Sequence, residues 1–277
     1  MNKSILITGC SSGIGFDAAR ALKSRGYRVF AGVRNPDDMT RLNQEGLEAV
    51  HLDYGNPYSI ERCAAHVLTA TNERPFALFN NGGMAQLGAV EDLRPELLRE
   101  QFEVSVFGWH DLTLRLLPYM RANGAGRIVN CSSVLGLVPM AHRGAYTAAK
   151  YAVEALTETM NMELHGTGVH AVLIEPGPIR TNFVHQSRLR LLETIDIYNS
   201  PYSKAYQSRM HKLESGGNQT WKLEPSAVTK KLIMALEKPN PKPRYYVTAP
   251  TYFMAAGKRL LGSSLMHKLL LQLSKSN

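Results

Sequence analysis

The fold is decided by the opening run Ser4-Ile5-Leu6-Ile7-Thr8-Gly9-Cys10-Ser11-Ser12-Gly13-Ile14-Gly15. Its first five residues form strands readily, and an amphipathic helical pattern follows Gly13 and ends at Gly26. A strand that turns directly into a helix through glycines is typical of the first unit of a parallel α/β fold. This stretch therefore predicts a strand, a tight turn and a helix, in that order.

The same alternation continues outward from this stretch. Short apolar runs have the composition of buried strands at 27–31, 49–52, 76–79, 127–130, 169–174 and 244–248, and helical patterns occupy 13–26, 58–72, 94–121 and 145–165. Strands that alternate with helices form a parallel sheet joined by right-handed crossovers. We predict a single α/β domain, a Rossmann-type doubly wound parallel sheet of about seven strands with helices on both faces.

Composition excludes several classes of protein. The chain has 277 residues, 44% of them apolar, and its three cysteines (Cys10, Cys63 and Cys131) give no disulfide framework. No apolar stretch reaches the roughly 18 residues of a membrane span, and the N-terminus lacks the pattern of a signal peptide. We expect a soluble, cytoplasmic protein with no transmembrane span.

The net charge of +9 is concentrated in the last third of the chain. From residue 184 onward there are 15 Lys and Arg against 5 Asp and Glu. Such a region could attract an anionic surface, but no nucleic-acid-binding motif accompanies it, and a solvated basic face is the favoured interpretation. We expect no nucleic-acid partner. The histidines show no metal-ligand spacing, so we expect no metal site either.

The glycine turn indicates a ligand. Glycines let the backbone approach a pyrophosphate closely, and the free N–H groups at the start of a helix attract its negative charge. The spacing Gly-x-x-x-Gly-x-Gly also occurs in flavin proteins, methyltransferases and structural corners. We predict a dinucleotide site, to which the turn contributes Gly9, Ser11, Ser12, Gly13, Ile14 and Gly15.

The end of the second strand should select the nucleotide. An NAD site usually has an acidic residue there for the ribose 2′-hydroxyl, whereas this chain reads Val33-Arg34-Asn35. Arg34 would pair with a 2′-phosphate, which favours NADP(H) as the cofactor. Asp53, at the end of the third strand, is a candidate for the adenine amino group, although a strand-end aspartate is also a common turn residue.

Three residues between 133 and 150 are candidates for catalysis. Tyr146 and Lys150 are four residues apart in a helical run, so both side chains project from one face. An ammonium beside a phenol favours the phenolate and should lower the pKa of Tyr146 from its ordinary value of about 10. Ser133 follows the fifth strand and should lie at the carboxyl edge of the sheet, where ligands bind.

Together these motifs resemble those of the short-chain dehydrogenase/reductase family, and the resemblance spans about residues 3–181. The matching motifs, in order, are the glycine turn at 8–15, Asn80-Asn81-Gly82-Gly83, Ser133, Tyr146-x-x-x-Lys150 and Pro176-Gly177-Pro178-Ile179-Arg180-Thr181. Any one of them could occur by chance, but the ordered set is very specific.

The resemblance implies a role for each matched residue. Tyr146 would exchange a proton with the substrate, Lys150 would bind the nicotinamide ribose, and Ser133 would hydrogen-bond the substrate oxygen. The dinucleotide would carry the hydride. The other cofactor contacts that the family implies are Asn80, Gly82, Tyr146 itself, Pro176, Gly177, Ile179 and Thr181. Among these, Thr181 would hold the nicotinamide carboxamide.

Two positions depart from the family pattern. Gly82-Gly83 replaces the usual Ala-Gly, a small change that should leave binding intact. Ser105 stands where many members have an asparagine that helps to hold a proton-relay water. Ser105 is therefore either a shorter catalytic residue in the same role or a helix serine that bonds its own backbone.

The segment 183–225 interrupts the alternation of strands and helices. It is polar, contains Tyr198, Tyr202, Tyr206 and Trp221, and is longer than an ordinary loop. We expect a substrate-covering insertion. The single domain would then comprise a cofactor-binding and catalytic core over 1–182, this insertion, and a region over 226–277 with a C-terminal helix, the last strand and a basic apolar tail.

The substrate pocket is predicted to be apolar. Its candidate residues are Met84, Leu135, Met140, His142 and Phe183, with Leu137 and Val138 as further apolar neighbours. Such a pocket suits a hydrophobic aldehyde or ketone better than a sugar or hydroxy acid. The tail at 252–271 has apolar residues at helical spacing with basic interruptions, so it could contact a membrane peripherally or pack on its own domain or a partner. The resemblance also implies a homodimer or homotetramer.

These observations predict an NADPH-dependent oxidoreductase that reduces hydrophobic aldehydes or ketones to alcohols, with Tyr146 as proton donor. The residues do not determine the direction, so an oxidative NADP-dependent alcohol, hydroxysteroid or retinol dehydrogenase is the second interpretation. The third is a non-catalytic NADP-binding regulator. The intact Ser133, Tyr146 and Lys150 argue against it, whereas Ser105 and the basic tail keep it open.

Overall fold

The computed structural model describes residues 3–214 and 221–276. Within them one sheet of seven strands has the order β3-β2-β1-β4-β5-β6-β7, and every neighbouring pair is parallel. The strands are β1 (Ser4–Thr8), β2 (Arg28–Val33), β3 (Glu48–His51), β4 (Ala77–Asn80), β5 (Gly126–Cys131), β6 (Val169–Glu175) and β7 (Arg244–Tyr246). The predicted doubly wound parallel sheet is confirmed.

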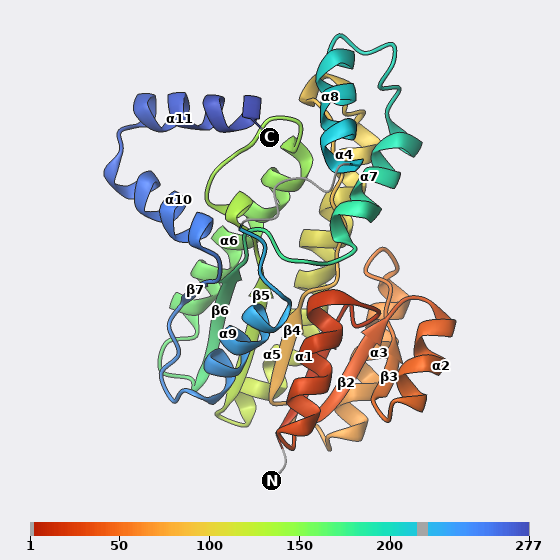
Figure 1. The fold of residues 1–277 in the computed structure, drawn as a ribbon. Coiled ribbons are helices and arrows are strands. Elements are labelled where there is room, and N and C mark those ends of the chain that lie inside the picture. The colour runs from red at the N-terminus through yellow and green to blue at the C-terminus, as the bar shows by residue number, and fades with distance from the viewer. Residues whose placement is uncertain (1–2, 215–220, 277) are drawn as a thin grey trace.

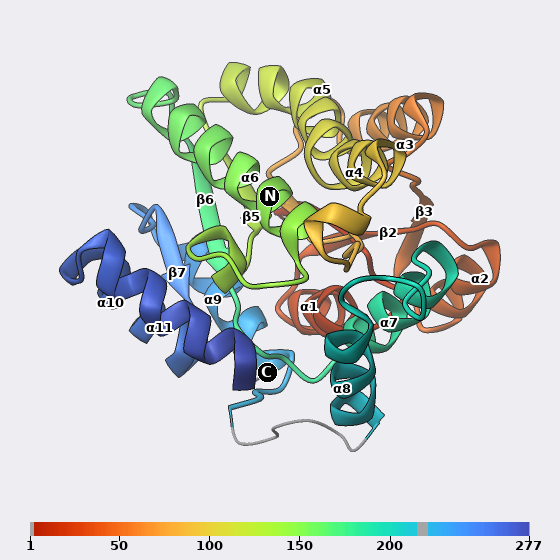
Figure 2. The ribbon, with the colours of Figure 1, turned by 90° about the horizontal axis from the view of Figure 1, so that it is seen from above.

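Helices cover both faces of the sheet (Figure 2). On one face lie α1 (Gly13–Ser24), α2 (Pro36–Gln44) and α9 (Ser226–Glu237), and on the other lie α3 (Pro57–Ala70), α4 (Pro95–Phe102), α5 (Gly108–Ala122) and α6 (Gly144–Glu163). The strands are buried on both faces, which explains their near-continuous apolar runs. The predicted helix at 94–121 is in fact two helices, because a π-helical turn at Glu103–Phe107 separates α4 from α5.

The reversal of strand order between β1 and β4 creates the site for a ligand. After β1 the chain turns to one face of the sheet to form α1, and after β4 it turns to the opposite face. The loops at the carboxyl ends of these two strands therefore diverge. Thr8, the last residue of β1, joins them: its Oγ1 accepts hydrogen bonds from the backbone N–H groups of Asn81 and Gly82, both at 2.9 Å. The two loops that matched the family motifs therefore meet at this edge.

Four further helices lie at the carboxyl edge of the sheet (Figure 1). They are α7 (Phe183–Thr194), α8 (Ser203–Glu214), α10 (Ala249–Leu260) and α11 (Ser263–Ser276). The predicted insertion thus contains α7 and α8, and part of it, 215–220, lies outside the described residues. Tyr206 of α8 is 1% exposed, and its hydroxyl donates to Asp92 Oδ2 at 2.6 Å and accepts from Ala89 N at 2.7 Å. These bonds fix the insertion on the loop that follows β4.

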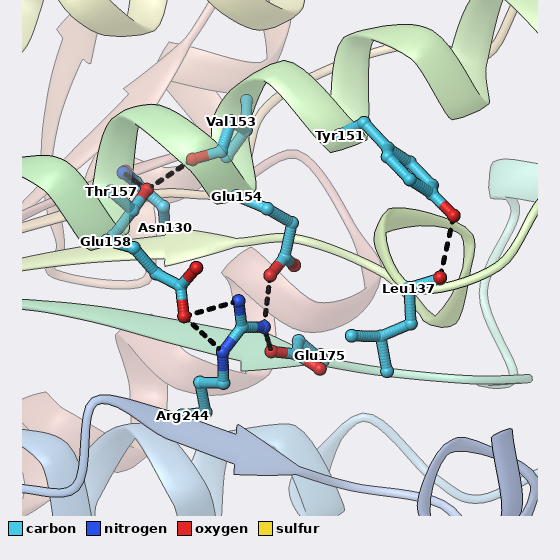
Figure 3. A network of polar contacts seen from close by, with 9 residues as sticks. All are labelled: Asn130, Leu137, Tyr151, Val153, Glu154, Thr157, Glu158, Glu175 and Arg244. Atoms are coloured by element: carbon cyan, nitrogen blue, oxygen red, sulfur yellow. Dashed lines mark hydrogen bonds and ion pairs between the residues drawn. The ribbon is translucent and has the colours of Figure 1, made fainter. Parts of the chain in front are cut away.

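A buried ionic cluster fastens α6 to the edge of the sheet (Figure 3). Arg244 of β7 contacts Glu154 and Glu158 of α6 and Glu175 of β6, with 2.5 Å between Nη1 and Glu175 Oε1. Glu175 is fully buried, and this burial, with the negative charge of Glu154, raises the pKa of Glu175 to about 8. One guanidinium therefore faces two buried carboxylates, and the raised pKa means that one of them holds a proton near neutral pH.

The structure also bears on the predicted absences. In residues 3–214 and 221–276, no helix is long and apolar enough to cross a membrane, and no group of His, Cys, Asp or Glu side chains is arranged to hold a metal ion. Cys10, Cys63 and Cys131 are free and buried. Burial raises the pKa of the Cys63 thiol to about 12 and that of Cys131 to about 11, so both are unreactive thiols at neutral pH.

Candidate active site

Ser133, Tyr146 and Lys150 converge beside the carboxyl end of β5. Ser133 follows β5 directly, and its Oγ accepts a hydrogen bond from Leu135 N at 3.1 Å. Tyr146 lies in the first turn of α6 and Lys150 one turn later, with the Lys150 ammonium 5.6 Å from the centroid of the Tyr146 ring. The structure thus places the phenol and the amine on one face of α6, beside the end of the strand.

Lys150 is almost entirely enclosed. Its side chain is 5% exposed, its Nζ donates to the carbonyl oxygen of Cys131 at 2.7 Å, and the ammonium lies 4.2 Å from the centroid of the Trp109 ring. Burial lowers the pKa of Lys150 to about 8. Lys150 is therefore mostly an ammonium at neutral pH and loses its charge in mildly alkaline solution.

The pKa of Tyr146 shifts in the direction opposite to our expectation. Burial of the phenol raises its pKa well above 10, and this exceeds the lowering by Ser133 and Arg143. The sequence-based expectation of a lowered value was wrong because it weighed the charge of Lys150 and not the loss of water around the phenolate. Tyr146 is consequently a neutral phenol at neutral pH, able to donate a proton.

Ser105 lies in the π-helical turn between α4 and α5. It is 1% exposed, and its Oγ accepts a hydrogen bond from Gln101 Nε2 at 2.8 Å, while a Cβ at Gly83 would lie 3.7 Å from that Oγ. Its partner is thus the side chain of Gln101 rather than its own backbone. Sequence reasoning missed Gln101, whose only signal was its place one helical turn before Ser105. π-Helical turns are frequent at functional sites.

The glycine turn packs tightly against the loop after β4. Gly9 has φ +71°, and a Cβ there would lie 2.6 Å from the Cα of Gly82. A Cβ at Gly15 would lie 2.3 Å from the carbonyl oxygen of Gly9, and one at Gly13 would lie 2.9 Å from Thr181 Cγ2. Only glycine fits at these three positions, and the fold brings Gly82 and Thr181 to the turn, as the family motifs imply.

The start of α1 is open to a ligand. Ser11 and Ser12 are exposed, and Ile14 is partly buried against the core. A surface cleft of about 610 Å³ begins at Ser12, Gly13 and Thr181 and continues along α1 to Ser24. Ser12 is the N-cap of α1, and its side chain makes no capping hydrogen bond. The first N–H groups of α1 therefore have no side-chain cap, as an anion-binding helix start requires.

The nucleotide-selecting positions lie beside the glycine turn. Arg34 follows β2 directly, is exposed, and has no ion pair or hydrogen bond from its guanidinium to the residues that the structure describes. Arg41 of α2, which sequence reasoning missed, donates from Nη2 to the carbonyl oxygen of Ser11 at 2.7 Å. Asp53 is partly buried, and its Oδ1 accepts from Gly55 N at 3.0 Å. Two arginines therefore flank this end of the turn.

Asn80 lies away from the cleft. It is 0% exposed, its Nδ2 donates to Asn130 Oδ1 at 2.8 Å, and its Oδ1 accepts from Tyr54 OH at 2.7 Å. The expected cofactor contact is therefore wrong for this side chain. Its amide joins β4 to β5, because a buried amide needs partners on every side.

The motif after β6 is divided between the interior and the cleft. The carbonyl oxygen of Pro176 accepts from Val134 N at 2.8 Å, and a Cβ at Gly177 would lie 2.1 Å from Thr248 Oγ1. Ile179 is 9% exposed and forms a β-bridge with Leu223. Pro176, Gly177 and Ile179 therefore hold the loop in place, and Thr181 is the motif residue that reaches the glycine turn.

The apolar side of Tyr146 faces the insertion. Its ring lies 5.8 Å from that of Phe183, and it packs against a buried cluster formed by the loop after β4 and by α4, α7 and α8: Ala85, Leu87, Ala89, Leu97, Leu191, Ile195, Ile197, Tyr206 and Met210. His142 has φ +60°, and its ring lies between those of Tyr202 and Tyr206, where burial lowers its pKa. The phenol is thus adjacent to an apolar environment supplied by α7 and α8.

The remaining predicted pocket residues differ in burial and in partners. Met84 and Met140 are partly buried, and Leu135 is 3% exposed. Leu137 and Val138 pack against Ala255 of α10 and Met266 of α11, so the expectation that they line the pocket is wrong. The tail therefore packs on its own domain through these residues, because its apolar helices cover the loop after Ser133.

Comparison with known proteins agrees with this geometry. A model of the short chain dehydrogenase family matches residues 3–191. The uncharacterized oxidoreductase YbbO of Escherichia coli is 40% identical over 270 residues, which cover 98% of this chain and 94% of that protein.

One solved structure similar to this chain contains NAD, and another contains NADPH. A short chain dehydrogenase/reductase from Burkholderia phymatum, in complex with NAD, has a TM-score of 0.77 at 26% identity and covers 94% of this chain and 92% of its own. A variant of actinorhodin polyketide ketoreductase with NADPH has a TM-score of 0.72 at 26% identity, covering 89% of this chain and 95% of its own. The cofactors of similar structures are therefore NAD in one case and NADPH in another.

Proposed function

Because the chain belongs to the short chain dehydrogenase family, we propose that it reduces apolar aldehydes or ketones to alcohols with NADPH. The observation that carries this proposal is the partly buried, neutral Tyr146 phenol beside Ser133 and Lys150. A phenol that holds its proton at neutral pH suits donation to a carbonyl oxygen better than abstraction from an alcohol.

The proposed chemistry assigns one task to each side chain. Bound NADPH supplies the hydride to the carbonyl carbon. The Ser133 hydroxyl donates a hydrogen bond to the carbonyl oxygen as negative charge develops there, and Tyr146 donates its proton to that oxygen. The Lys150 ammonium then stabilises the phenolate that remains, and solvent returns the proton to Tyr146.

The residues at the reversal of strand order between β1 and β4 fit a dinucleotide. A side chain at Gly9, Gly13 or Gly15 would clash with neighbouring protein atoms, so the glycines keep the turn tight. The N–H groups at the start of α1 can bind a pyrophosphate. Arg34 and Arg41 would lie near an adenosine ribose placed at the end of β2. Thr181, against Gly13, would meet the nicotinamide side.

A substrate panel tests the proposal. With purified protein and NADPH, straight-chain aldehydes should show kcat/KM values that rise about fourfold per methylene until the apolar cluster is filled, because each buried methylene contributes about 0.8 kcal/mol. A polyhydroxylated aldehyde of equal length is the matched control and should react slowly. Absence of NADPH oxidation with every carbonyl, or equal rates for the apolar and hydroxylated substrates, would contradict the proposal.

Arg34 should set the preference for the phosphorylated nucleotide. Arg34→Ala should raise the KM for NADPH roughly 10- to 100-fold, because a charge-assisted contact to the 2′-phosphate is lost, and leave the KM for NADH unchanged. Arg62→Ala, at an exposed position on α3, is the control and should alter neither value. Equal effects on both nucleotides in the Arg34 variant would exclude this role.

The pH dependence should follow Lys150. Because burial lowers its pKa to about 8, the rate of reduction should fall about tenfold per pH unit above that value as the ammonium loses its proton. In Lys150→Arg the guanidinium stays charged, so whatever activity remains should lack this alkaline decline. Steady-state rates from about pH 6 to about pH 10 provide the measurement, and a decline that persists in the Arg variant would point to another group.

A further inference from the structure

Two arginines meet at the start of α6, beside the candidate proton donor. Arg143 is the N-cap of α6, three residues before Tyr146, and its Nε is enclosed by protein without a hydrogen-bond partner in the described chain. Arg209 of α8 is 9% exposed, and its Nη1 donates to the carbonyl oxygen of Ala141 at 3.4 Å. The insertion thus brings a second cation to the segment that leads into Tyr146.

No carboxylate in the described residues forms an ion pair with either guanidinium. Burial and the positive charge of Arg209 lower the pKa of Arg143 to about 10, and burial lowers that of Arg209. Arginines that are enclosed and repel each other are costly to hold in a fold unless an anion joins them. Their arrangement therefore indicates a negatively charged ligand.

The acidic side chains of this region have other partners. Asp92 Oδ2 accepts hydrogen bonds from the hydroxyls of Tyr206 at 2.6 Å and Ser200 at 2.7 Å. Glu91 Oε2 accepts from the Tyr202 hydroxyl at 3.1 Å. These bonds tie the insertion to the loop after β4 and leave the charges of Arg143 and Arg209 uncompensated.

The arginine pair is electrostatically linked to the reacting group. Arg143 caps the helix whose first turn carries Tyr146, and its charge lowers the pKa of Tyr146. Tyr146 also packs in the apolar cluster with residues of α7 and α8. A molecule whose carbonyl lies at Tyr146 would therefore have an apolar wall and a pair of cations within reach.

Resting on the reductase function proposed above, we propose that Arg143 and Arg209 form a carboxylate-binding subsite and that the substrate is an oxo acid. One end of such a molecule is the aldehyde or ketone at Tyr146, its middle is apolar, and its other end is a carboxylate. The Nε–H and one Nη–H of an arginine form the fork that binds a carboxylate with two parallel hydrogen bonds. The N-terminal end of α6 adds positive potential to the same place.

The test compares two substrates that differ only in charge, an ω-oxo carboxylate and its methyl ester of the same chain length. The wild-type protein should prefer the acid by roughly 10- to 100-fold in kcat/KM, mostly through KM, since charge-assisted hydrogen bonds are lost with the ester. Arg143→Gln and Arg209→Gln should each reduce this preference toward unity, because each should slow turnover of the acid more than turnover of the ester. Lys204→Gln, an exposed position on α8, should leave the preference intact.

A second measurement uses binding alone. Octanoate carries the carboxylate and the apolar chain but no carbonyl, and it should raise the midpoint of thermal unfolding of the wild-type protein but not of Arg143→Gln. Without octanoate, Arg143→Gln should be at least as stable as the wild type, because an uncompensated cation has been removed.

The two measurements separate this inference from the proposed reductase. Turnover of acid and ester at equal kcat/KM would overturn the subsite and leave the reductase standing. Stabilisation by octanoate that depends on Arg143, without turnover of either compound, would support the subsite and overturn the reductase. Equal losses on acid and ester in both Gln variants would mean that the arginines are structural, and would also overturn the subsite.

Discussion

Tyr146→Phe should reduce the rate of NADPH-dependent carbonyl reduction roughly 10²- to 10⁴-fold, the range usual for loss of a general acid. The substitution removes only the hydroxyl, so the ring keeps its contact with Phe183 at 5.8 Å and its place in the apolar cluster. Removal of a buried, neutral hydroxyl leaves no charge behind, and the fold should be retained. The affinity for NADPH should change little, because the glycine turn and Arg34 are untouched.

Single-turnover kinetics and fluorescence titration with NADPH give the rate and the affinity for this variant. Tyr58→Phe is the matched control, because Tyr58 is 79% exposed on α3 and should have no effect on either quantity. A variant that keeps the wild-type rate would show that Tyr146 does not donate the proton. Wild-type protein that binds NADPH but reduces no carbonyl would favour the third interpretation, a nucleotide-binding regulator.

Arg244→Met should lower the free energy of unfolding by about 3–5 kcal/mol at neutral pH, the loss typical when one partner of a buried ion pair is removed. Met keeps much of the volume of the arginine stem, but Glu175, fully buried, and Glu154, with 7% of its side chain exposed, would then face each other without a cation. Urea unfolding followed by circular dichroism measures the difference. Glu158→Gln, where the side chain is 49% exposed, should cost less than about 1 kcal/mol and serves as control.

The pH dependence of this loss has a definite sign. The pKa of Glu175 is raised to about 8 in the folded protein, so its contribution is present in acid and is lost as the pH rises toward 8. Without Arg244 the carboxylates become harder to ionise, and the destabilisation should therefore be larger at about pH 8 than at about pH 5. A loss of the same size at both pH values would contradict the account of one cation shared by two buried carboxylates.

The sequence was sufficient to predict the strands. The predicted run at 4–8 coincides with β1, and the run at 169–174 differs from β6 by one residue, because an apolar run buried on both faces is a local signal. The break between α4 and α5 was not predicted, since the π-helical turn shows no departure from helical periodicity, and the bond between Gln101 and Ser105 becomes visible only in three dimensions.

The candidate site was predictable only in part. Motif spacing indicates which residues stand at the edge of the sheet, and it correctly brought Tyr146 and Lys150 together. It does not indicate which way a side chain points, so Asn80 was assigned to the cleft although its amide lies in the core. The pKa of Tyr146 and the approach of Arg209 both depend on how the insertion packs, and the polar composition of that segment carries no such information.

The cluster around Arg244 has a consequence for folding during protein synthesis. The helix that carries Tyr146 and Lys150 is fastened by a residue near the far end of the polypeptide, in the last strand of the sheet. A ribosome that has released only the first two-thirds of the chain has exposed both groups, but not the strand that pins their helix. The active site is therefore completed only late in translation. A chain truncated before residue 244 should bind nucleotide poorly and should be degraded readily.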